Sequence, residues 1–254
     1  VAQEWGGLEA LSGIPGATGA TPIQNVGAYG AEVAQTVASV RTWDRRDGCY
    51  RSFAAADCGF GYRSSRFKTE PGRYLVVEVR FQLALGSQSA PIRYAELARR
   101  LGIGLGERAP AAQVREAVLE LRRSKGMVVD VADHDTWSTG SFFMNPVLEQ
   151  RAAAALPDDA PRFLQPDGRV KTSAAWLIQR AGFEPGYGSG AARLSTKHSL
   201  ALTNRGGATT ADLLDLAREI RDGVEARFGV RLVPEPVLVG CDLEARFDGR
   251  DETT

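Results

Sequence analysis

The spacing of hydrophobic residues predicts strands in the first part of the chain and helices further on. Three runs, 36–43, 50–55 and 74–83, are short and rich in β-branched and aromatic residues, as strands are. The third run alternates hydrophobic with polar residues, which predicts a half-buried strand with Val77 and Val79 on its buried face. The first part of the chain is therefore expected to contain a sheet.

From residue 93 onwards the hydrophobic residues recur at intervals of three and four positions, which is the spacing of amphipathic helices. The clearest of these begins at a Thr or Asp cap and ends at Gly229. The expected helices are 94–102, 109–126, 147–156, 170–182 and 209–229. Segment 137–143 is expected to be a loop, 198–204 a strand, and 230–240 an extended edge strand interrupted by prolines.

Together these elements predict an α+β fold. It is strand-rich to about residue 126, helix-rich to about residue 230 and extended beyond that point. With 254 residues the chain can form one large domain or two smaller ones, and either can bury a hydrophobic core.

Composition and charge exclude several classes of protein. Lys and Arg together number 31, as do Asp and Glu, so a net charge of zero gives no general attraction to nucleic acid or membrane. The three cysteines, Cys49, Cys58 and Cys241, share no CxxC spacing, which argues against a disulfide framework or a zinc site and fits a reducing cytoplasm. No hydrophobic run approaches the roughly 20 residues of a membrane-spanning helix. We therefore expect a cytoplasmic protein that binds no nucleic acid, membrane or metal ion.

Three residues in unusual surroundings are candidates for chemistry, and each also has a structural interpretation. Ser141 lies between a glycine and two phenylalanines, where a hydroxyl either caps a backbone group or takes part in a reaction. Arg63, in a connection rich in glycine and aromatic residues, is either a solvated arginine or an anion clamp. Glu235, between two prolines, could be an edge-strand charge that deters aggregation.

The glycine-rich stretch 13–30 and the two histidines give weaker signals. The stretch lacks the GKS or GKT of a Walker A loop and the GxGxxG of a Rossmann fold, so turns are its simpler interpretation. His134 and His198 have no ligand-spaced partners, and the acidic cluster 130–135 has no second cluster that would complete a metal site.

Five stretches in one order along the chain carry a resemblance to a known family. They are SGIPGATGATPIQNVGAYG, CGFGYRSSRFK, GSFFMNP, GYGSGAARLSTKHSLALTN and LVPEPVLVG. Together they closely resemble the UDP-N-acetylenolpyruvoylglucosamine reductases, also called UDP-N-acetylmuramate dehydrogenases, the MurB family of flavoenzymes in bacterial peptidoglycan synthesis. The resemblance extends from Leu11 to Gly240.

The resemblance implies three catalytic residues. Ser141 of the GSFF motif is expected to donate a proton to carbon. Arg63 of the GYR motif and Glu235 of the PE motif are expected to flank the reacting enolpyruvyl group. A guanidinium fork suits the enolate-like carboxylate that would form there, and the two phenylalanines after Ser141 are expected to keep water from its hydroxyl.

The resemblance also implies a substrate site and a cofactor site. The residues expected to hold the substrate are Tyr94, Lys125, Asn145 and His198, and Lys125 and Asn145 match residues that hold the nucleotide diphosphate. The residues expected to contact FAD are Gly13, Pro15, Gly16, Gly19, Thr21, Ile23, Gln24, Asn25, Gly27 and Tyr29.

The implied activity is the reduction of UDP-N-acetylglucosamine enolpyruvate to UDP-N-acetylmuramate, with bound FAD and with NADPH as co-substrate. A cytoplasmic monomer is expected, with roles in cell wall biogenesis, cell shape and cell division. The alternative is a truncated, non-catalytic module that binds nucleotide sugars.

The resemblance also predicts how the chain is divided. The family's N-terminal glycine-rich loop, which wraps the FAD pyrophosphate, has no counterpart here. Residues 1–126 are therefore expected to be the C-terminal portion of a two-part FAD-binding domain of the vanillyl-alcohol-oxidase/PCMH-like type. Residues 127–230 would form an α+β substrate-binding domain, and residues 231–254 a segment that returns to the active site.

Overall fold

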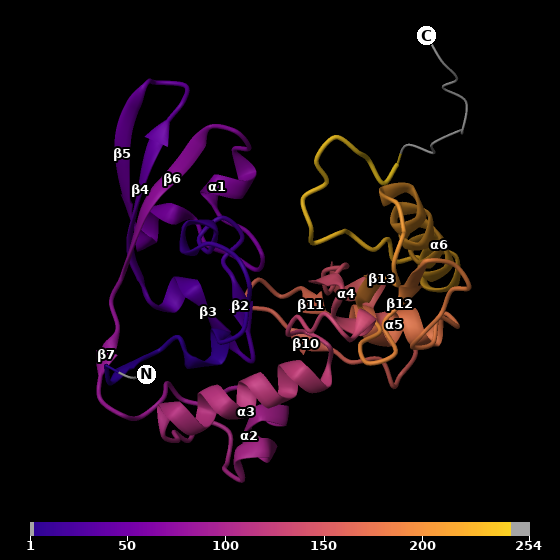
Figure 1. The fold of residues 1–254 in the computed structure, drawn as a ribbon, viewed down its shortest axis with the longest axis horizontal. Helices are drawn as coiled ribbons and strands as arrows, with labels where there is room; N and C mark the ends of the chain where they lie inside the picture. Colours follow the sequence, from indigo (N-terminus) through magenta and orange to yellow (C-terminus); the bar gives the residue numbers. More distant parts are fainter. Residues whose placement is uncertain (1–2, 245–254) are drawn as a thin grey trace. The chain divides into compact units, whose positions relative to one another are not determined.

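A computed structural model describes residues 3–244 of the chain. The chain forms two compact units, one up to Arg123 and a second from Ser124 onwards. Both combine helices with strands (Figure 1), which confirms the predicted α+β class. In this part of the chain no helix is both long and hydrophobic enough to cross a membrane.

The first unit consists of short strands, one three-stranded sheet and three helices. Its elements are β1 (Trp5–Gly6), β2 (Gly27–Ala28), β3 (Ala31–Glu32), β4 (Val37–Asp44), β5 (Cys49–Ala54), α1 (Arg66–Thr69), β6 (Tyr74–Phe81), β7 (Ala84–Leu85), α2 (Ala95–Leu101) and α3 (Ala111–Ser124). Strands β5, β4 and β6 form an antiparallel sheet in that order, and β1 pairs with β7 as β2 does with β3. Helices α2 and α3 pack against each other through a separate small core that contains Leu97, Val114 and Val118.

The predicted buried face of β6 is wrong at Val77, whose side chain is 47% exposed. The cause is a bulge: Arg41 of β4 pairs with Glu78 while the next residue, Thr42, pairs with Val76. The extra residue shifts the inside–outside alternation, so that Val76 packs against the core in place of Val77, while Val79 packs there as predicted. Strict alternation in the sequence cannot reveal such a shift.

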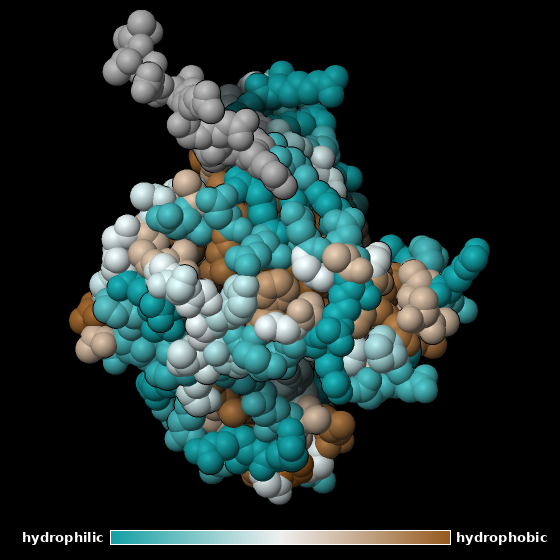
Figure 2. Space-filling view, turned by 90° about the vertical axis from the view of Figure 1, so that its right-hand side faces the viewer, coloured by the Kyte–Doolittle hydropathy of each residue, from teal (hydrophilic) through white to brown (hydrophobic). Residues whose placement is uncertain are grey.

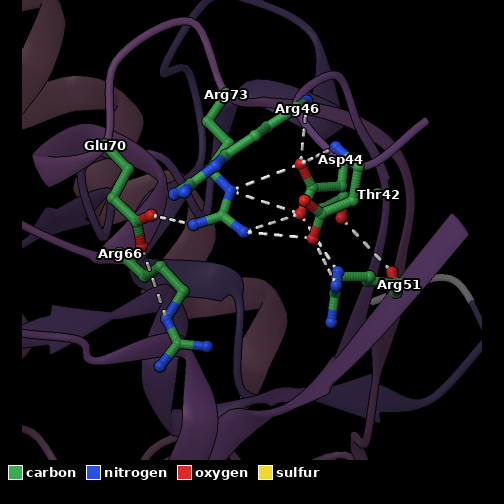
Figure 3. A network of polar contacts seen from close by, with 8 residues as sticks. Thr42, Asp44, Arg46, Arg51, Arg66, Glu70 and Arg73 are labelled. Atoms are coloured by element: carbon green, nitrogen blue, oxygen red, sulfur yellow. Dashed lines mark hydrogen bonds and ion pairs between the residues drawn. The ribbon is translucent and has the colours of Figure 1, made fainter. Parts of the chain in front are cut away.

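A buried carboxylate organises the end of this sheet. The Asp44 side chain is fully buried and accepts hydrogen bonds from Arg73 Nη2 at 3.0 Å and from the Arg46 backbone N–H at 3.0 Å. Arg51 Nε lies 3.0 Å from the same carboxylate, and Arg73 also pairs with Glu70 at 2.6 Å (Figure 3). The hydrogen bond from Arg73, against the effect of desolvation, lowers the pKa of Asp44 to about 2.

The second unit places helices against a three-stranded sheet. Its elements are β8 (Ser138–Ser141), β9 (Val147–Leu148), α4 (Gln150–Ala154), β10 (Phe163–Leu164), β11 (Val170–Lys171), α5 (Ala174–Arg180), β12 (Ala192–Leu194), β13 (Ala201–Asn204) and α6 (Thr210–Phe228). Strand β13 lies between β12 and β8, and all pairings are antiparallel. The core of this unit includes Phe143, Leu177, Leu194 and Ile220, all fully buried.

Helix α6 agrees with its prediction to within a residue at each end. Thr209 accepts a hydrogen bond from the Asp212 N–H at 3.2 Å, and Asp212 accepts one from the Thr209 N–H at 2.8 Å, which forms a capping box. Gly229 ends the helix with a φ of 64°, a left-handed conformation that favours glycine. Both signals are local, and this is why the sequence reveals them.

Other segments of the second unit differ from prediction. Segment 137–143 was expected to be a loop, but its residues Ser138–Ser141 form edge strand β8, because they pair with β13. Segment 230–240 was expected to be a strand, but it makes only one isolated bridge, between Phe143 and Pro234. Helix α4 is shorter than the predicted 147–156, since residues Val147–Leu148 pair with β11.

Candidate functional site

Arg63 lies in a tight turn next to the glycine-rich stretch. Gly61 and Ser64 pair across the turn, and Arg63 between them has a φ of 51°. Its Nη2 donates a hydrogen bond to the Gly27 carbonyl at 2.9 Å. A Cβ atom added to Gly27 would lie 3.1 Å from Arg63 Nη1 and 2.8 Å from the Ala31 carbonyl oxygen, so only glycine allows this approach. The structure thus brings one predicted catalytic residue against a predicted cofactor residue.

Asn25 links the same two segments from inside the unit. It is 1% exposed, its Oδ1 accepts from the Ala34 N–H at 3.0 Å, and its Nδ2 donates to Glu32 at 2.8 Å and to the Gly61 carbonyl at 3.1 Å. The side chain of Asn25 therefore holds the two loops together.

Backbone conformation marks this region independently of the side chains. In the described part of the chain the non-glycine residues with positive φ are Glu4, Asn25, Tyr29 and Arg63. Three of the four belong to the predicted site. Such conformations cost about 1–2 kcal/mol per residue and accumulate at functional sites, where the surrounding structure maintains them.

Tyr29 connects this region to the predicted substrate residue Tyr94. The two rings meet edge to face, with centroids 5.5 Å apart. Burial raises the pKa of Tyr29 to about 12, although the charge of Arg122 acts in the opposite direction. Tyr94 remains 42% exposed.

The other predicted cofactor residues form an exposed turn and a supporting base. Pro15 and Gly16 are exposed, and no atom lies within 4 Å of a Cβ added to Gly16. Gly13 lies next to α3. A Cβ atom added to Gly13 would be 2.8 Å from Leu119. Bare backbone at Gly16 beside a rigid base is suited to close approach by a flat or phosphorylated group, so this stretch fits part of an FAD site.

The remaining predicted cofactor residues of this stretch are half-buried and pack against the rest of the first unit. The Ile23 carbonyl accepts from Ser65 Oγ at 2.5 Å, and Thr21 Oγ1 donates to the Thr18 carbonyl at 2.7 Å. A Cβ atom added to Gly19 would lie 3.9 Å from Val76. Gln24 is half-buried and follows Ile23 in the chain, next to Asn25.

In the second unit, Ser141 lies at the end of β8, paired in register with Ala201 of β13. Its Oγ is 3.2 Å from Nε2 of His198, in the connection between β12 and β13. Sequence analysis placed both residues in the site but did not predict their contact, because 57 residues separate them in the chain.

Phe142 and Phe143, which follow Ser141 in the chain, belong to the core of the second unit. They meet edge to face at 5.0 Å between centroids and are 7% and 1% exposed. The Glu235 N–H donates to the Phe142 carbonyl at 2.7 Å, which holds Glu235 beside the end of β8.

Asn145 and Lys125 are fixed by different neighbours. Asn145 Oδ1 accepts from the Ala174 N–H at 2.9 Å, which satisfies one of the free donors at the start of α5. Lys125 directly follows α3, and a Cβ added to the next residue, Gly126, would lie 2.8 Å from the Asp135 carbonyl oxygen.

Sequence analysis missed the role of two acidic residues. Asp135 is 5% exposed and accepts from the Thr196 N–H at 2.9 Å, from the Thr196 hydroxyl, and from Arg205 Nη2 at 2.5 Å. Burial alone would raise the pKa of Asp135, but the bonds from Thr196 and the charge of Arg205 lower it on balance. Asp133 pairs with the Lys197 ammonium group, and this hydrogen bond lowers the pKa of Asp133. The only sign of this in the sequence is the acidic run 130–135. In the folded chain, Asp133 and Asp135 of this run bind Lys197 and Thr196.

A cavity of about 680 Å³ opens beside β8 in the second unit. Thr139 and Phe142 line it on one side, Leu214 of α6 and Val237 on others, and no charged residue is among its lining residues in the described chain. The cavity suits a hydrophobic group rather than a diphosphate. On the face shown in Figure 2, hydrophobic residues form small patches separated by hydrophilic ones. Among residues 3–244, no three His, Cys, Asp or Glu side chains gather as metal ligands would.

Comparison with known proteins adds a family to this geometry. Residues 132–239 match the family described as UDP-N-acetylenolpyruvoylglucosamine reductase, C-terminal domain. The chain is 59% identical to a UDP-N-acetylenolpyruvoylglucosamine reductase of Thermobifida fusca, over 93% of this chain and 69% of that protein. It is 58% identical to the reductase of Cutibacterium acnes, over 96% of this chain and 65% of that protein. The chain thus spans about two thirds of the length of these relatives.

A solved structure supports the fold. The crystal structure of UDP-N-acetylenolpyruvylglucosamine reductase from Thermus caldophilus is similar to this one with a TM-score of 0.58 and 24% sequence identity. The similarity covers 91% of this chain and 64% of that one. At this identity it is evidence for the arrangement of the backbone alone.

Proposed function

This chain belongs to the UDP-N-acetylenolpyruvoylglucosamine reductase family, and on that premise we propose that it is the larger part of an enzyme that reduces UDP-N-acetylglucosamine enolpyruvate to UDP-N-acetylmuramate. The enzyme would act in the cytoplasm on a precursor of peptidoglycan. NADPH would be the reductant and FAD the bound cofactor.

The observation that carries this proposal is the arrangement around Ser141. The Ser141 hydroxyl lies 3.2 Å from Nε2 of His198. Phe142, the residue after Ser141, accepts a hydrogen bond from the Glu235 backbone N–H. A hydroxyl and an imidazole thus lie together at one end of β8, where the backbone of Glu235 is also held. This is a set of groups that can supply a proton to carbon and orient the donor.

Each catalytic residue has a distinct task in the proposed reaction. FAD, when bound, supplies the hydride that reduces the enolpyruvyl double bond. Ser141 donates the proton to the neighbouring carbon. Arg63 grips the substrate carboxylate, on which negative charge develops, and Glu235 helps to stabilise the same group. Arg63 is in the first unit, and Ser141 and Glu235 are in the second.

The cofactor and the substrate would be held by the residues that the resemblance identified. The glycine-rich stretch would hold part of the FAD: the backbone around Gly16 and Gly27 would contact it, Asn25 would maintain the loops and Tyr29 would border the site. The first unit would then be the C-terminal portion of a two-part FAD-binding domain, completed by a segment of the relatives that this chain does not span.

Tyr94, Lys125, Asn145 and His198 are proposed to contact the substrate. Lys125 and Asn145 would hold its diphosphate, far from the reacting carbons. Their contacts would be similar in the ground state and the transition state, so they should affect affinity more than turnover.

The test is an assay of the purified holoenzyme. We expect the flavin absorption bands in the purified protein, NADPH oxidation that depends on UDP-N-acetylglucosamine enolpyruvate, and a product identified as UDP-N-acetylmuramate by mass spectrometry. A yellow protein whose NADPH oxidation does not respond to this substrate would contradict the proposal. A colourless protein that binds UDP-sugars without reducing them would favour a non-catalytic binding module.

A further inference from the structure

His198 is held close to Ser141 by a clamp of hydrogen bonds. The connection between β12 and β13 is closed by bonds from the Ser195 N–H to the Ala201 carbonyl at 2.8 Å and from the Ala201 N–H to the His198 carbonyl at 3.0 Å. Within it, the Lys197 N–H donates to Ser195 Oγ at 3.0 Å. The backbone that carries His198 is therefore fixed on both sides of the histidine.

The clamp is anchored to the segment that leads into Ser141. Asp135, buried just before β8, binds both the N–H and the hydroxyl of Thr196, and Asp133 pairs with Lys197. The same short stretch of chain thus fixes the position of the histidine and carries the serine. The contact between Ser141 and His198 is pre-organised by several bonds and does not depend on one flexible side chain.

The direction of the hydrogen bond between the two side chains has chemical consequences. If Nε2 of His198 carried no hydrogen, it would accept the Ser141 proton and direct it away from any substrate. If Nε2 carries a hydrogen, it donates to Ser141 Oγ, and the hydroxyl proton of Ser141 remains available. Only the second arrangement suits a serine that acts as an acid.

We propose that His198 is a positioning residue, whose Nε2–H donates to Ser141 Oγ and thereby prepares Ser141 to give its proton to the substrate. This rests on the proposed function of Ser141. When the Ser141 O–H bond breaks and the carbon–hydrogen bond forms, the electron pair of the O–H bond stays on Oγ. The resulting alkoxide is stabilised by the hydrogen bond from Nε2 until a proton from water restores the hydroxyl.

The first test is independent of enzymatic activity. The sequence contains two histidines, so ¹⁵N labelling of histidine gives signals that can be assigned by substituting each in turn. We expect Nε2 of His198 to carry a hydrogen that exchanges slowly with water. In Ser141→Ala this hydrogen should exchange faster and its signal should shift, while the signals of His134, which packs on Trp137 at 4.4 Å, stay in place. A His198 whose Nε2 carries no hydrogen would overturn the proposal.

The second test measures steady-state kinetics of the holoenzyme. His198→Ala should lower kcat on the order of 10-fold to 100-fold, the usual effect of a lost hydrogen bond to a developing charge. The KM for the enolpyruvyl substrate should change little. His198→Gln should recover much of kcat, because its amide N–H can replace Nε2–H, and His134→Gln serves as the matched control with unchanged kinetics.

The two tests separate the possible failures. A raised KM with unchanged kcat in His198→Ala would contradict the proposal, because His198 would then act only through its contact with the substrate and not through Ser141. Equal losses in His198→Ala and His198→Gln would also contradict the proposal, because the donated hydrogen bond would then not be the cause. If wild-type protein fails to reduce the substrate, the proposed function is wrong, and the labelling experiment still decides the direction of the hydrogen bond.

Discussion

At Ser141, the proposed proton donor, the surroundings expected from the sequence differ from those in the structure. Sequence analysis attributed its reactivity to a dry pocket formed by two phenylalanines, but both rings lie in the core of the second unit. What the structure places against the hydroxyl is the imidazole of His198. Motif resemblance could identify both residues, but their contact depends on the pairing of β8 with β13, which no local pattern in the sequence encodes.

Replacing Ser141 by Ala should separate the two halves of the proposed reaction. Reduction of the flavin by NADPH should remain nearly intact, because it requires no proton on carbon. Reoxidation by the enolpyruvyl substrate should slow by orders of magnitude, and Ser141→Cys should retain more activity than Ala because a thiol can donate a proton. Stability should fall by only about 1 kcal/mol, the usual value of one hydrogen bond. Stopped-flow absorbance follows each half separately, and equal slowing of both would show that Ser141 only shapes the pocket.

Arg63→Lys should be largely inactive although it keeps the positive charge. An ammonium group cannot form the planar fork that grips a carboxylate, nor can it reproduce the bond from Nη2 to the Gly27 carbonyl while reaching a substrate. We expect a large loss of kcat/KM for the enolpyruvyl substrate. The far-ultraviolet circular dichroism spectrum of the variant should match that of wild type. Full activity in Arg63→Lys would rule out the carboxylate clamp.

At the scale of elements, local signals were read correctly and signals that depend on pairing were not. The ends of α6 are encoded by Thr209, Asp212 and Gly229, which act on their immediate neighbours, and the prediction for this helix was accurate. The bulge at Val77 and the strand Ser138–Ser141 depend on a partner strand, and no local pattern in the sequence indicates either. Some glycines illustrate the same limit, because the residue that leaves no room for a side chain lies far away in the sequence.

Gly223, inside α6, is such a glycine, and Gly223→Ala should destabilise the second unit. In most helices this change stabilises by roughly 0.5–1 kcal/mol, because alanine is the better helix former. Here a Cβ would lie 2.6 Å from Phe183 Cζ and 2.7 Å from Cε2, and Phe183 is 7% exposed in the core. Overpacking of this kind typically costs about 1–3 kcal/mol, so we expect a net loss in the free energy of unfolding.

Urea unfolding monitored by circular dichroism measures that loss. The matched control is Gly190→Ala, where no atom lies within 4 Å of the added Cβ and φ is not positive. This control should change stability little. A stabilised Gly223→Ala would mean that the ring of Phe183 moves aside without cost.

At the scale of the whole molecule, both units have hydrophobic cores, one large cluster in the second unit and two smaller ones in the first. The second unit relies on one large hydrophobic cluster, whereas the sheet of the first unit ends in the buried carboxylate of Asp44 and its arginine partners (Figure 3). The family resemblance correctly predicted the α+β fold, but nothing in the sequence around Asp44 showed that its charge would be buried. Arg73, its main partner, is 29 residues away in the chain.

The first unit should therefore lose stability in acid through Asp44. Its pKa in the folded protein is about 2, below its ordinary value of 3.8, so the ionised form stabilises the fold at pH values above about 4. That contribution should disappear as pH falls from about 4 to about 2, because the folded state then binds the proton that the unfolded state has already taken up. Asp44→Asn should be less stable than wild type at neutral pH, and the difference in free energy of unfolding should shrink across this window.

Asp159→Asn, which breaks an exposed ion pair with Arg180 in the second unit, is the control and should show little difference at any pH. Urea titrations at closely spaced pH values test this. If the difference between wild type and Asp44→Asn stays constant down to pH 2, folding and the bond from Arg73 do not lower the pKa of Asp44.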